Sequence, residues 1–472
     1  MAEQNEIRYE SLADFDMRRR TFLKAAAAFG VVSAVSGGCG RLNSGSNAKA
    51  KIVIIGGGAA GISMASRLVR SLKMADITLI DAADRQFYQP GFTLIASGVY
   101  KPEQVYRQQS DCMPKGVKWV KRMVVALDPA QNKVTVDGGG VYSYDFLVLT
   151  PGLQLNWQKI EGLSLKTLGQ GNAHSIYDFE GSQKTWPALQ AFVKKGGRGI
   201  FTDTYTKLKC GGAPKKICLL TEHLARKSGT RQNVSIDYFS ASHELYDVPY
   251  FTPRLEEIYR ERQVTVSLNV RVKGVDTSSK KVYFNRVEKI KKDQTDPQTG
   301  KVVTVEETVT TPFAEDYDFL HFVPPQSAPD FVRQAGLGWT EGKLAADAWA
   351  MVDKATLVHL KYPNIVCLGD VAGIPTSKTS AAIRKQVPVA ARNLIALVEG
   401  RAPEATYDGY AACPIVTDYG HVLLCEFDYD KKPKSSFPFS LLDTSKELWP
   451  AWLLKVYVLK PLYFYGMLPG YC

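Results

Sequence analysis

The sequence predicts an α/β fold with two Rossmann-like domains, and three observations predict it. A buried strand, a glycine-rich turn, a helix and a second strand follow one another between Lys51 and Asp81. Two later strand-and-turn segments, Tyr144 to Gly152 and Pro363 to Asp370, have the same apolar character. A separate group of candidate strands occupies roughly 197–325. At roughly 150 residues per domain, a chain of 472 residues with 45% hydrophobic content can form several packed units.

The glycine-rich turn defines the first domain. Lys51 to Ile55 is a buried strand, Gly56-x-Gly58-x-x-Gly61 is the turn, and a helix from Ile62 to Leu72 follows it. Glycines let the backbone approach a pyrophosphate at the helix N-terminus, where amide donors favour anions. The second strand, Ile77 to Ile80, ends on Asp81, whose carboxylate can accept hydrogen bonds from ribose hydroxyls.

The later segments decide which dinucleotide is expected. Tyr144 to Gly152 and Pro363 to Asp370 resemble the FAD-contacting segments of two-dinucleotide-domain flavoproteins, so we expect FAD. Asp370 would bind the ribityl chain or a phosphate, although it could also cap the helix that starts near Thr379. The predicted cofactor-binding residues are Gly56, Gly58, Ala59, Ala60, Gly61, Asp81, Ala82, Gln89, Pro90, Val124, Thr150, Pro151, Gly152, Gly369, Asp370 and Lys378.

The second domain lacks a glycine fingerprint of its own. Where its first strand should run into a phosphate loop, the sequence is FTDTYTKLKCGGAP. Without spaced glycines a pyrophosphate cannot approach the backbone, so we do not expect NAD(P)H to be a substrate. The candidate strands here are Gly199 to Thr202, Val234 to Phe239, Val264 to Asn269 and Lys281 to Phe284.

Cys210 stands in place of that loop, ahead of a helix predicted from Pro214 to Lys227. Helix N-termini and nearby cations lower a thiol pKa toward ~3.5 to 7.5, which makes a thiolate nucleophile. The alternative is a small buried residue at a helix start, but the glycines and lysines, expected to be exposed, favour the nucleophile. Cys218 is interpreted as core. The lysines are Lys207, Lys209, Lys215 and Lys216.

Several strings resemble the sulfide:quinone oxidoreductases of the mitochondrial and related bacterial type. The resemblance runs from about Lys51 to the last residue and implies FAD, a membrane quinone and sulfide oxidation through cysteine persulfides. The strings are FYQPGFTLIASG (Phe87 to Gly98), KCGGAPKKI (Lys209 to Ile217), LHFVPPQSAPD (Leu320 to Asp330), GDVAGIPTSKTSAA (Gly369 to Ala382) and YDGYAACPIVTDYGHVLLCEFDY (Tyr407 to Tyr429).

The sequence departs from that family at one position. The family uses two cysteines, and Cys210 matches the first, but Val371 stands where the second is expected. Without a resolving thiol the usual cycle cannot run unaltered. Cys367, four residues before Val371, is either a buried structural residue or a substitute for the missing second cysteine. Cys112 matches no family position, and Cys413 and Cys425 are interpreted as structural.

Lys378 completes the catalytic candidates, Cys210, Lys378 and Cys367. It lies in the string PTSKT at a predicted helix start, where its charge could stabilise N1 and the C2 carbonyl of a reduced flavin. The alternative is a solvated lysine at the start of a helix.

The C-terminal tail is apolar and aromatic from Leu448 to Leu468, and prolines should prevent one continuous spanning helix. Its Trp, Tyr and Lys content favours a monotopic segment that lies in lipid headgroups. Packing against the FAD domain is the alternative. Phe437, Phe439, Tyr463 and Phe464 could line a quinone entrance.

The N-terminus predicts export. Arg19 and Arg20 begin a match to the twin-arginine pattern R-R-x-F-L-K, and the apolar stretch Ala25 to Val35 is too short to span ~30 Å of hydrocarbon. A short basic amphipathic helix stays an alternative. We expect cleavage between Gly30 and Ala50, and Cys39 follows a stretch that partly matches a lipoprotein site.

The net charge and the number of cysteines exclude few classes of function. The 59 Lys and Arg against 47 Asp and Glu give a net charge of +12, which favours anionic partners, but no single run is basic enough for a nucleic-acid arm. Eight cysteines are too sparse for a disulfide scaffold. No metal site and no nucleic-acid partner are predicted, and a homo-oligomer stays open.

Together these patterns predict an exported, FAD-dependent oxidoreductase on the periplasmic side of a membrane, which oxidises sulfide or a related sulfur species and reduces a membrane quinone. Two alternatives stay open: the flavoprotein subunit of a flavocytochrome c type sulfide dehydrogenase, and a non-catalytic FAD-binding paralogue. The expected organisation is a signal and linker over 1–50, a first FAD-binding segment over 51–196, a second Rossmann-like domain over 197–325, a second FAD-binding segment over 326–400 and a quinone- and membrane-contacting region over 401–472.

Overall fold

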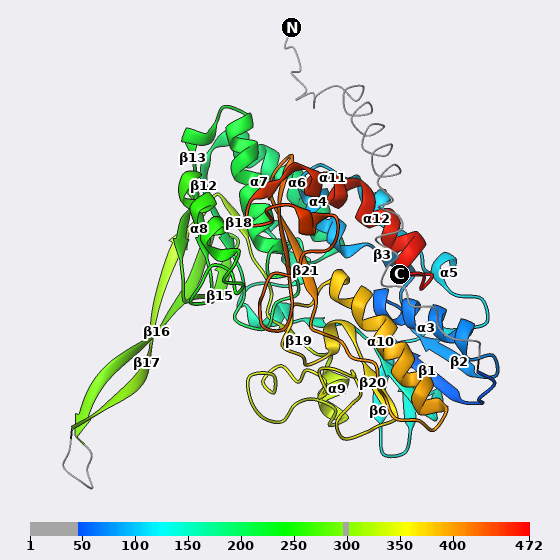
Figure 1. Cartoon of the computed structure of the whole chain (residues 1–472). Coiled ribbons are helices and arrows are strands. Elements are labelled where there is room, and N and C mark those ends of the chain that lie inside the picture. Colours follow the sequence, from blue (N-terminus) through cyan, green and yellow to red (C-terminus); the bar gives the residue numbers. More distant parts are fainter. Residues whose placement is uncertain (1–45, 296–301) are drawn as a thin grey trace, which may run out of the picture.

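A computed structural model describes residues 46–295 and 302–472 (Figure 1). The predicted twin-arginine pattern, the apolar stretch after it and Cys39 lie outside these described residues. The predictions of export and cleavage therefore stay predictions.

The first domain is built on a five-stranded parallel sheet in the order β20-β9-β1-β2-β5. The predicted strand Lys51 to Ile55 is confirmed as β1. Helix α3 begins at Ala59, three residues before the predicted start, because Gly58 already serves as its extended N-cap. The strands are β20 (Ile365–Cys367), β9 (Phe146–Leu149), β1 (Lys51–Ile55), β2 (Asp76–Ile80) and β5 (Lys118–Val120).

The second domain has another five-stranded parallel sheet in the order β11-β18-β12-β13-β14, so the predicted fold with two Rossmann-like domains is confirmed. The chain enters this sheet at Ala173, before the predicted boundary at 197, through a two-residue strand too short to leave a sequence pattern. The strands are β11 (Ala173–His174), β18 (Phe319–His321), β12 (Gly197–Thr202), β13 (Val234–Phe239) and β14 (Thr265–Ser267).

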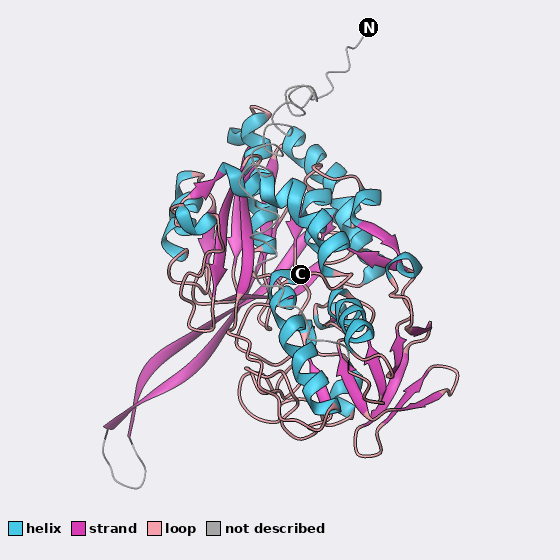
Figure 2. Cartoon of the chain, turned by 45° about the vertical axis from the view of Figure 1, so that its right-hand side comes forward, coloured by secondary structure: helices cyan, strands magenta, loops and turns pink. Residues whose placement is uncertain are grey.

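Helices pack against both parallel sheets (Figure 2). In the first domain α3 packs against α10, and in the second α6 packs against α7. The helices are α3 (Ala59–Ser71), α4 (Phe92–Ala96), α5 (Gln109–Cys112), α6 (Phe179–Lys195), α7 (Ala213–Lys227), α8 (Thr252–Glu261), α9 (Asp330–Gln334), α10 (Ser380–Val398), α11 (Trp449–Leu453) and α12 (Leu459–Leu462).

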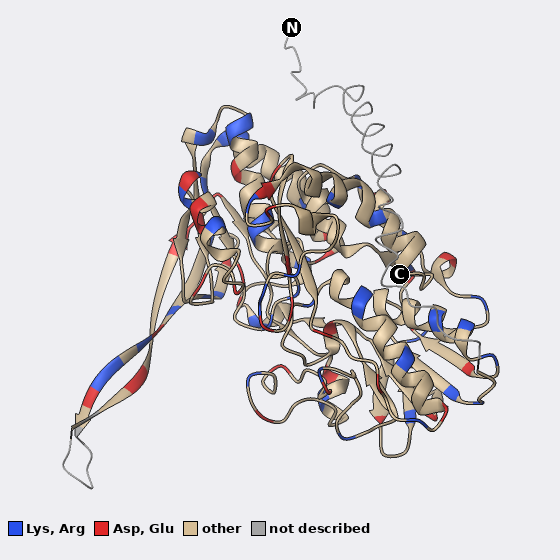
Figure 3. Ribbon diagram, viewed as in Figure 1, with Lys and Arg blue, Asp and Glu red and all other residues tan. Residues whose placement is uncertain are grey.

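A long hairpin projects from the second domain (Figure 1). The strand predicted to end at Phe284 continues to Thr295 as β16 and pairs with β17, which the sequence analysis missed. Charged residues of both signs follow Phe284, as Figure 3 shows, so the pattern of a half-buried strand is lost there. The antiparallel elements are β15 (Val270–Asp276), β16 (Lys281–Thr295) and β17 (Val302–Asp316), with the smaller β3 (Arg85–Phe87), β4 (Tyr106–Gln108), β6 (Val124–Asp128), β7 (Lys133–Val136), β8 (Val141–Ser143), β10 (Gln154–Leu155) and β19 (Gln326–Ser327).

The C-terminal region forms a three-stranded antiparallel sheet and a helical tail. Strand β21 packs against α7, and α11 packs against β22. The tail stays helical from Trp449 to Met467, but π-helical turns follow α11 and α12, so its hydrogen-bond ladder is irregular around Pro461. Among the described helices, none has both the length and the apolar character needed to cross a bilayer. The strands are β21 (Ala411–Asp418), β22 (His421–Phe427) and β23 (Glu447–Leu448).

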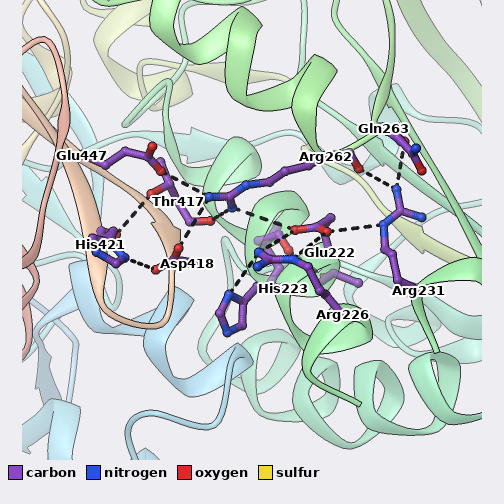
Figure 4. Close-up of polar contacts among 12 residues, drawn as sticks. Glu222, His223, Arg226, Arg231, Arg262, Gln263, Thr417, Asp418, His421 and Glu447 are labelled. Atoms are coloured by element: carbon purple, nitrogen blue, oxygen red, sulfur yellow. Dashed lines mark hydrogen bonds and ion pairs between the residues drawn. The ribbon is translucent and has the colours of Figure 1, made fainter. Parts of the chain in front are cut away.

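An ion-pair network joins α7 to the C-terminal sheet (Figure 4). The side chain of Glu222 on α7 is 2% exposed and faces three arginines, one of which is Arg262. The Arg262 guanidinium also pairs with Asp418 at 3.5 Å and with Glu447 at 3.2 Å. The network therefore fixes α7 against β21, the strand that carries Cys413.

Candidate active site

One cavity of about 860 Å³ runs between the two domains and the tail. Its walls come from the turn after β1, the loop before α7, the start of α10 and the inner face of the tail. Of the predicted site residues, those that line it are Gly56, Gly58, Ala59, Ala60, Asp81, Gln89, Pro90, Thr150, Pro151, Gly152, Cys210, Gly369, Asp370 and Lys378.

Four predicted site residues lie outside the lining. Gly61 lies inside α3, where a Cβ would be 1.8 Å from the Gly56 carbonyl oxygen, so it permits close packing of the helix on the turn. Ala82 neighbours the lining residue Asp81, and Val124 lies on β6. Cys367 lies in strand β20, fully buried in the core.

The turn after β1 fits a pyrophosphate. Gly56 has a φ of +94°, and a Cβ there would be 2.3 Å from the Thr150 carbonyl oxygen, so only glycine is accommodated. At Gly58 a Cβ would meet no protein atom within 4 Å, which leaves room for a ligand at the N-terminus of α3. Asp81 holds the turn by accepting a hydrogen bond from the Gly57 amide at 2.5 Å.

The other end of the expected cofactor site also suits a polyol. Asp370 is 5% exposed, and its Oδ1 is buried without a hydrogen-bond partner among the described residues. Its Oδ2 pairs with the Lys209 ammonium, which also donates to Gln89 Oε1. A buried acceptor beside the cavity is the group that a ribityl hydroxyl requires. The residues present therefore fit FAD.

Lys378 is not a solvated lysine. It is 5% exposed, and its Nζ donates to the carbonyls of Asp370 and Ala372 and lies 3.8 Å from the centre of the Trp349 ring. Burial, reinforced by the positive charge of Lys207, holds the pKa of Lys378 well below its ordinary value. Lys378 is thus a buried lysine whose donated hydrogen bonds fix it in the cavity wall.

The loop before α7 fixes Cys210 directly beside Lys378. The Cys210 amide donates to the Lys378 carbonyl at 3.1 Å, and Cys210 adopts a left-handed backbone with φ of 51°. Its Sγ lies 3.3 Å from the Nζ of Lys216. Lys215 and Lys216 are each 3% exposed, so our expectation of exposed lysines was wrong for these two.

A second thiol faces Cys210. The Sγ of Cys413, on β21, lies 3.1 Å from the Sγ of Cys210. A hydrogen bond from the Cys413 thiol, together with the Lys216 charge, holds the pKa of Cys210 well below its ordinary value although burial opposes this. The same hydrogen bond and burial raise the pKa of Cys413. The Cys210 thiolate in turn raises the pKa of Lys216, to about 12 against its burial.

The structure bears on two sequence-based interpretations of cysteines. Cys413, interpreted as structural, is buried in the core but contacts the Cys210 sulfur, and no sequence pattern could have paired it with a residue some two hundred positions earlier. Cys367, considered as a substitute thiol, does not line the cavity, and burial raises its pKa. Val371, at the position of the missing cysteine, is fully buried.

The end of β12 is closed by protein groups where a second nucleotide would bind. Asp203 follows the strand and accepts hydrogen bonds from Ser240 Oγ at 2.8 Å and from the Ala241 amide at 2.7 Å. The Lys215 ammonium lies 3.6 Å from the same carboxylate and donates to Tyr238. This buried cluster supports the expectation that NAD(P)H does not bind here.

The tail closes the far end of the cavity. Its inner face packs on the first domain: Ser63 Oγ donates to the Met467 carbonyl at 2.8 Å, and Gln86 Nε2 donates to Tyr463 Oη at 2.7 Å. Lys455 donates to the Pro90 carbonyl, and burial lowers its pKa to about 7. Three of the residues predicted for a quinone entrance line the cavity, namely Phe437, Phe439 and Tyr463, whereas Phe464 does not.

Comparison with known proteins identifies the family. The model for pyridine nucleotide-disulphide oxidoreductases matches residues 50–191. The mitochondrial sulfide:quinone oxidoreductase of Mus musculus is 35% identical over 421 residues, which cover 89% of this chain and 87% of the relative. The chain belongs to the sulfide:quinone oxidoreductase family. The family's Schizosaccharomyces pombe member is 31% identical over 410 residues, with 82% of each chain covered.

The fold agrees with this assignment. The crystal structure of the sulfide:quinone oxidoreductase from Aquifex aeolicus superposes with a TM-score of 0.69 and 22% identity, and covers 89% of this chain and 92% of that one. As a member of the family, the protein is an FAD-dependent oxidoreductase. The assignment of FAD to individual residues stays a prediction that their positions around the cavity support.

Proposed function

We propose that this flavoprotein oxidises sulfide, or a closely related sulfur species, and passes the electrons to a quinone in a membrane. The observation that carries the proposal is the continuity of one cavity. Its lining includes the dinucleotide turn at Gly56, the activated thiol of Cys210 and apolar tail residues such as Leu459 and Leu462. A sulfur donor, a flavin and a hydrophobic acceptor could therefore meet within a single space.

The side chains around Cys210 suit sulfur chemistry. Its thiolate form is stabilised by the Lys216 ammonium at 3.3 Å, and thiolates are the nucleophiles in sulfur exchange. The Cys210 amide donates to the Lys378 carbonyl and the Cys210 carbonyl accepts from the Ala213 amide, and these bonds hold the residue in the cavity wall. When bound, FAD supplies acceptance of two electrons and their transfer to a further acceptor.

The quinone end of the proposal rests on the tail. Its inner face lines the cavity, while Trp449 at its start is 41% exposed. Just before the tail, Leu441 is 75% and Leu442 is 45% exposed. Lys431, Lys432 and Lys434 lie upstream, but each pairs with an aspartate, so they add little net positive charge. The support for peripheral membrane contact is therefore the group of exposed aromatic and aliphatic side chains. A membrane-facing tail is more consistent with a quinone than with a haem-protein acceptor.

The proposed location is the periplasmic side, reached by the twin-arginine route. The support is the sequence pattern at Arg19 and Arg20, and a folded, cofactor-loaded flavoprotein is the kind of cargo that this route carries. A fusion of residues 1–50 to a reporter that must fold before export would test it. Loss of export when both arginines become lysine is expected, and unchanged export would contradict the proposal.

The function itself is tested by two half-reactions on the holoprotein. Under anaerobic conditions sulfide should bleach the visible absorbance of the bound flavin, and a soluble short-chain quinone should then restore it. Bleaching without recovery would contradict quinone as the acceptor. Absence of bleaching would contradict sulfide as the donor, and rapid bleaching by NADH would contradict the closed second nucleotide site.

A further inference from the structure

A complete pair of thiols is present in this protein, although one of them comes from an unexpected strand. Cys210 precedes α7, and Cys413 lies on β21, yet their sulfurs are 3.1 Å apart. The position after Gly369 and Asp370, where a second cysteine was expected, holds a buried valine. The second thiol is therefore missing from the turn after β20 and present on β21.

We propose that Cys413 is the resolving thiol of the active site and that Cys210 and Cys413 interconvert between a dithiol and a disulfide during turnover. This inference deepens the proposed sulfide oxidation and rests on it. A disulfide requires its two sulfurs to approach to about 2.05 Å. Bond formation therefore requires the Cys210 and Cys413 sulfurs to move slightly closer than their observed contact.

The space beside Cys413 is shaped for this approach. Gly212 precedes α7, and a Cβ added there would lie 2.7 Å from the Cys413 sulfur. The absence of a side chain at Gly212 thus leaves room for Cys413 to reach Cys210. The Arg262 network holds α7 and β21 together, so the two sulfurs are presented by elements that are fixed to each other.

The cavity determines which sulfur the substrate meets. Cys210 lines the cavity, whereas Cys413 is 1% exposed and lies behind it. A hydrosulfide ion entering from the cavity would therefore attack the Cys210 sulfur and displace the Cys413 sulfur. The Lys216 ammonium, 3.3 Å from Cys210, attracts the anion and stabilises the charge that remains there.

The first step is an exchange that needs no oxidant. Hydrosulfide forms a new S–S bond to Cys210 while the Cys210–Cys413 bond breaks, and the proton of hydrosulfide passes to the Cys413 sulfur. The products are a Cys210 persulfide anion and a neutral Cys413 thiol, so three sulfurs, one proton and one negative charge appear on both sides.

A thiolate acceptor then removes the outer sulfur of the persulfide and becomes a persulfide itself, which leaves Cys210 as a thiolate. Closing the pair again joins the Cys210 thiolate to the Cys413 thiol and releases two electrons and one proton. A two-electron acceptor of the flavin class takes up these electrons. The placement of the charge agrees with the geometry, because the anion lies at Cys210 beside Lys216 whenever the pair is open.

Three other described cysteines, Cys425, Cys367 and Cys218, do not offer this partnership. Cys425 lies opposite Cys413 in the β21–β22 register, but its sulfur donates to the Leu423 carbonyl at 3.6 Å. Cys367 belongs to the sheet of the first domain, and Cys218 lies inside α7 in the core of the second. Cys425 therefore serves as a matched control, since it is equally buried and on the neighbouring strand.

The proposal is tested by mapping disulfides and persulfides in the full chain with FAD bound. Free thiols are blocked in the oxidised protein, which is then digested without reductant and analysed by mass spectrometry. We expect a peptide pair joined through Cys210 and Cys413 in the wild type and in Cys425→Ser, and no such pair in Cys413→Ser. After anaerobic addition of sulfide, an alkylated persulfide should appear at Cys210 with one newly free thiol at Cys413.

The outcomes separate this proposal from the proposed function. If sulfide bleaches the flavin of the wild type but Cys210 and Cys413 never appear linked, the pairing is wrong and sulfide oxidation stands. If the linked pair is found but sulfide neither opens it nor bleaches the flavin, the function is wrong. Mapping of the wild type alone can refute the pairing, so the test does not depend on whether Cys413→Ser folds.

Discussion

Replacing Lys216 by methionine tests the electrostatic account of Cys210 most sharply. The variant keeps the length and apolar stem of the side chain but removes an ammonium 3.3 Å from the Cys210 sulfur. An opposite charge at this range typically shifts a pKa by ~1–3 units. At ~1.4 kcal/mol per unit, the thiolate should lose about 1.4–4 kcal/mol of stabilisation.

The sign of the effect follows from the charge. The Lys216 ammonium favours the ionised form of Cys210, so its removal raises the pKa of Cys210 and lowers the thiolate fraction at any pH below the new midpoint. The assay is the rate of Cys210 alkylation by iodoacetamide against pH, followed by mass spectrometry in protein that has been reduced and desalted anaerobically. The midpoint should move up by about 1–3 units.

Two controls accompany this measurement. Lys446→Met removes a lysine whose side chain is 75% exposed and should leave the midpoint unchanged. Lys216→Arg keeps the positive charge, so the midpoint of Cys210 should stay much closer to the wild-type value than in Lys216→Met. A midpoint that is the same in Lys216→Met as in the wild type would refute the view that Lys216 activates Cys210.

Three further predictions concern the cofactor site, the network and the tail. Gly56→Ala should fail to fold stably because its Cβ would collide with the Thr150 carbonyl. Gly58→Ala should fold but retain less FAD, measured as the ratio of flavin to protein absorbance. Full retention of FAD in Gly58→Ala would contradict the pyrophosphate position. In urea titrations Arg262→Met should lower the free energy of unfolding by about 1.5–3 kcal/mol, the usual range for a charged hydrogen bond. An unchanged urea midpoint would show that the network in Figure 4 does not hold α7. The double change Leu441→Ser and Leu442→Ser should weaken binding to anionic vesicles while flavin bleaching by sulfide stays normal. Ile290→Ser on the distant hairpin is the control. Equal vesicle binding by the wild type, the double variant and the control would argue against docking through this C-terminal region.

The sequence predicted the first domain well because its elements are local. The strand, turn and helix around Gly56 depend on a continuous apolar run and on glycines at fixed spacing, and both are visible without tertiary information. Strand β13 was predicted with its observed bounds, Val234–Phe239, for the same reason. By contrast, β17 was missed because its charged residues face solvent on both sides of a projecting hairpin.

The candidate site was predicted only in part because its decisive contact is not local. The helix after Cys210 and the surrounding lysines predict a reactive thiol, which the Lys216 contact supports, but the buried state of Lys216 depends on how α7 packs. The contact between Cys210 and Cys413 depends on β21 crossing α7, and no spacing rule encodes that crossing. Resemblance to the family directed attention to Val371 instead, which is a buried apolar residue here.

The central claim is that electrons leave sulfide through the thiol of Cys210. Anaerobic stopped-flow mixing of sulfide with the wild type and with Cys210→Ser, each with FAD bound, tests it most directly. Rapid bleaching of the wild-type flavin and none in Cys210→Ser are predicted. Bleaching at the same rate in both proteins would contradict the account.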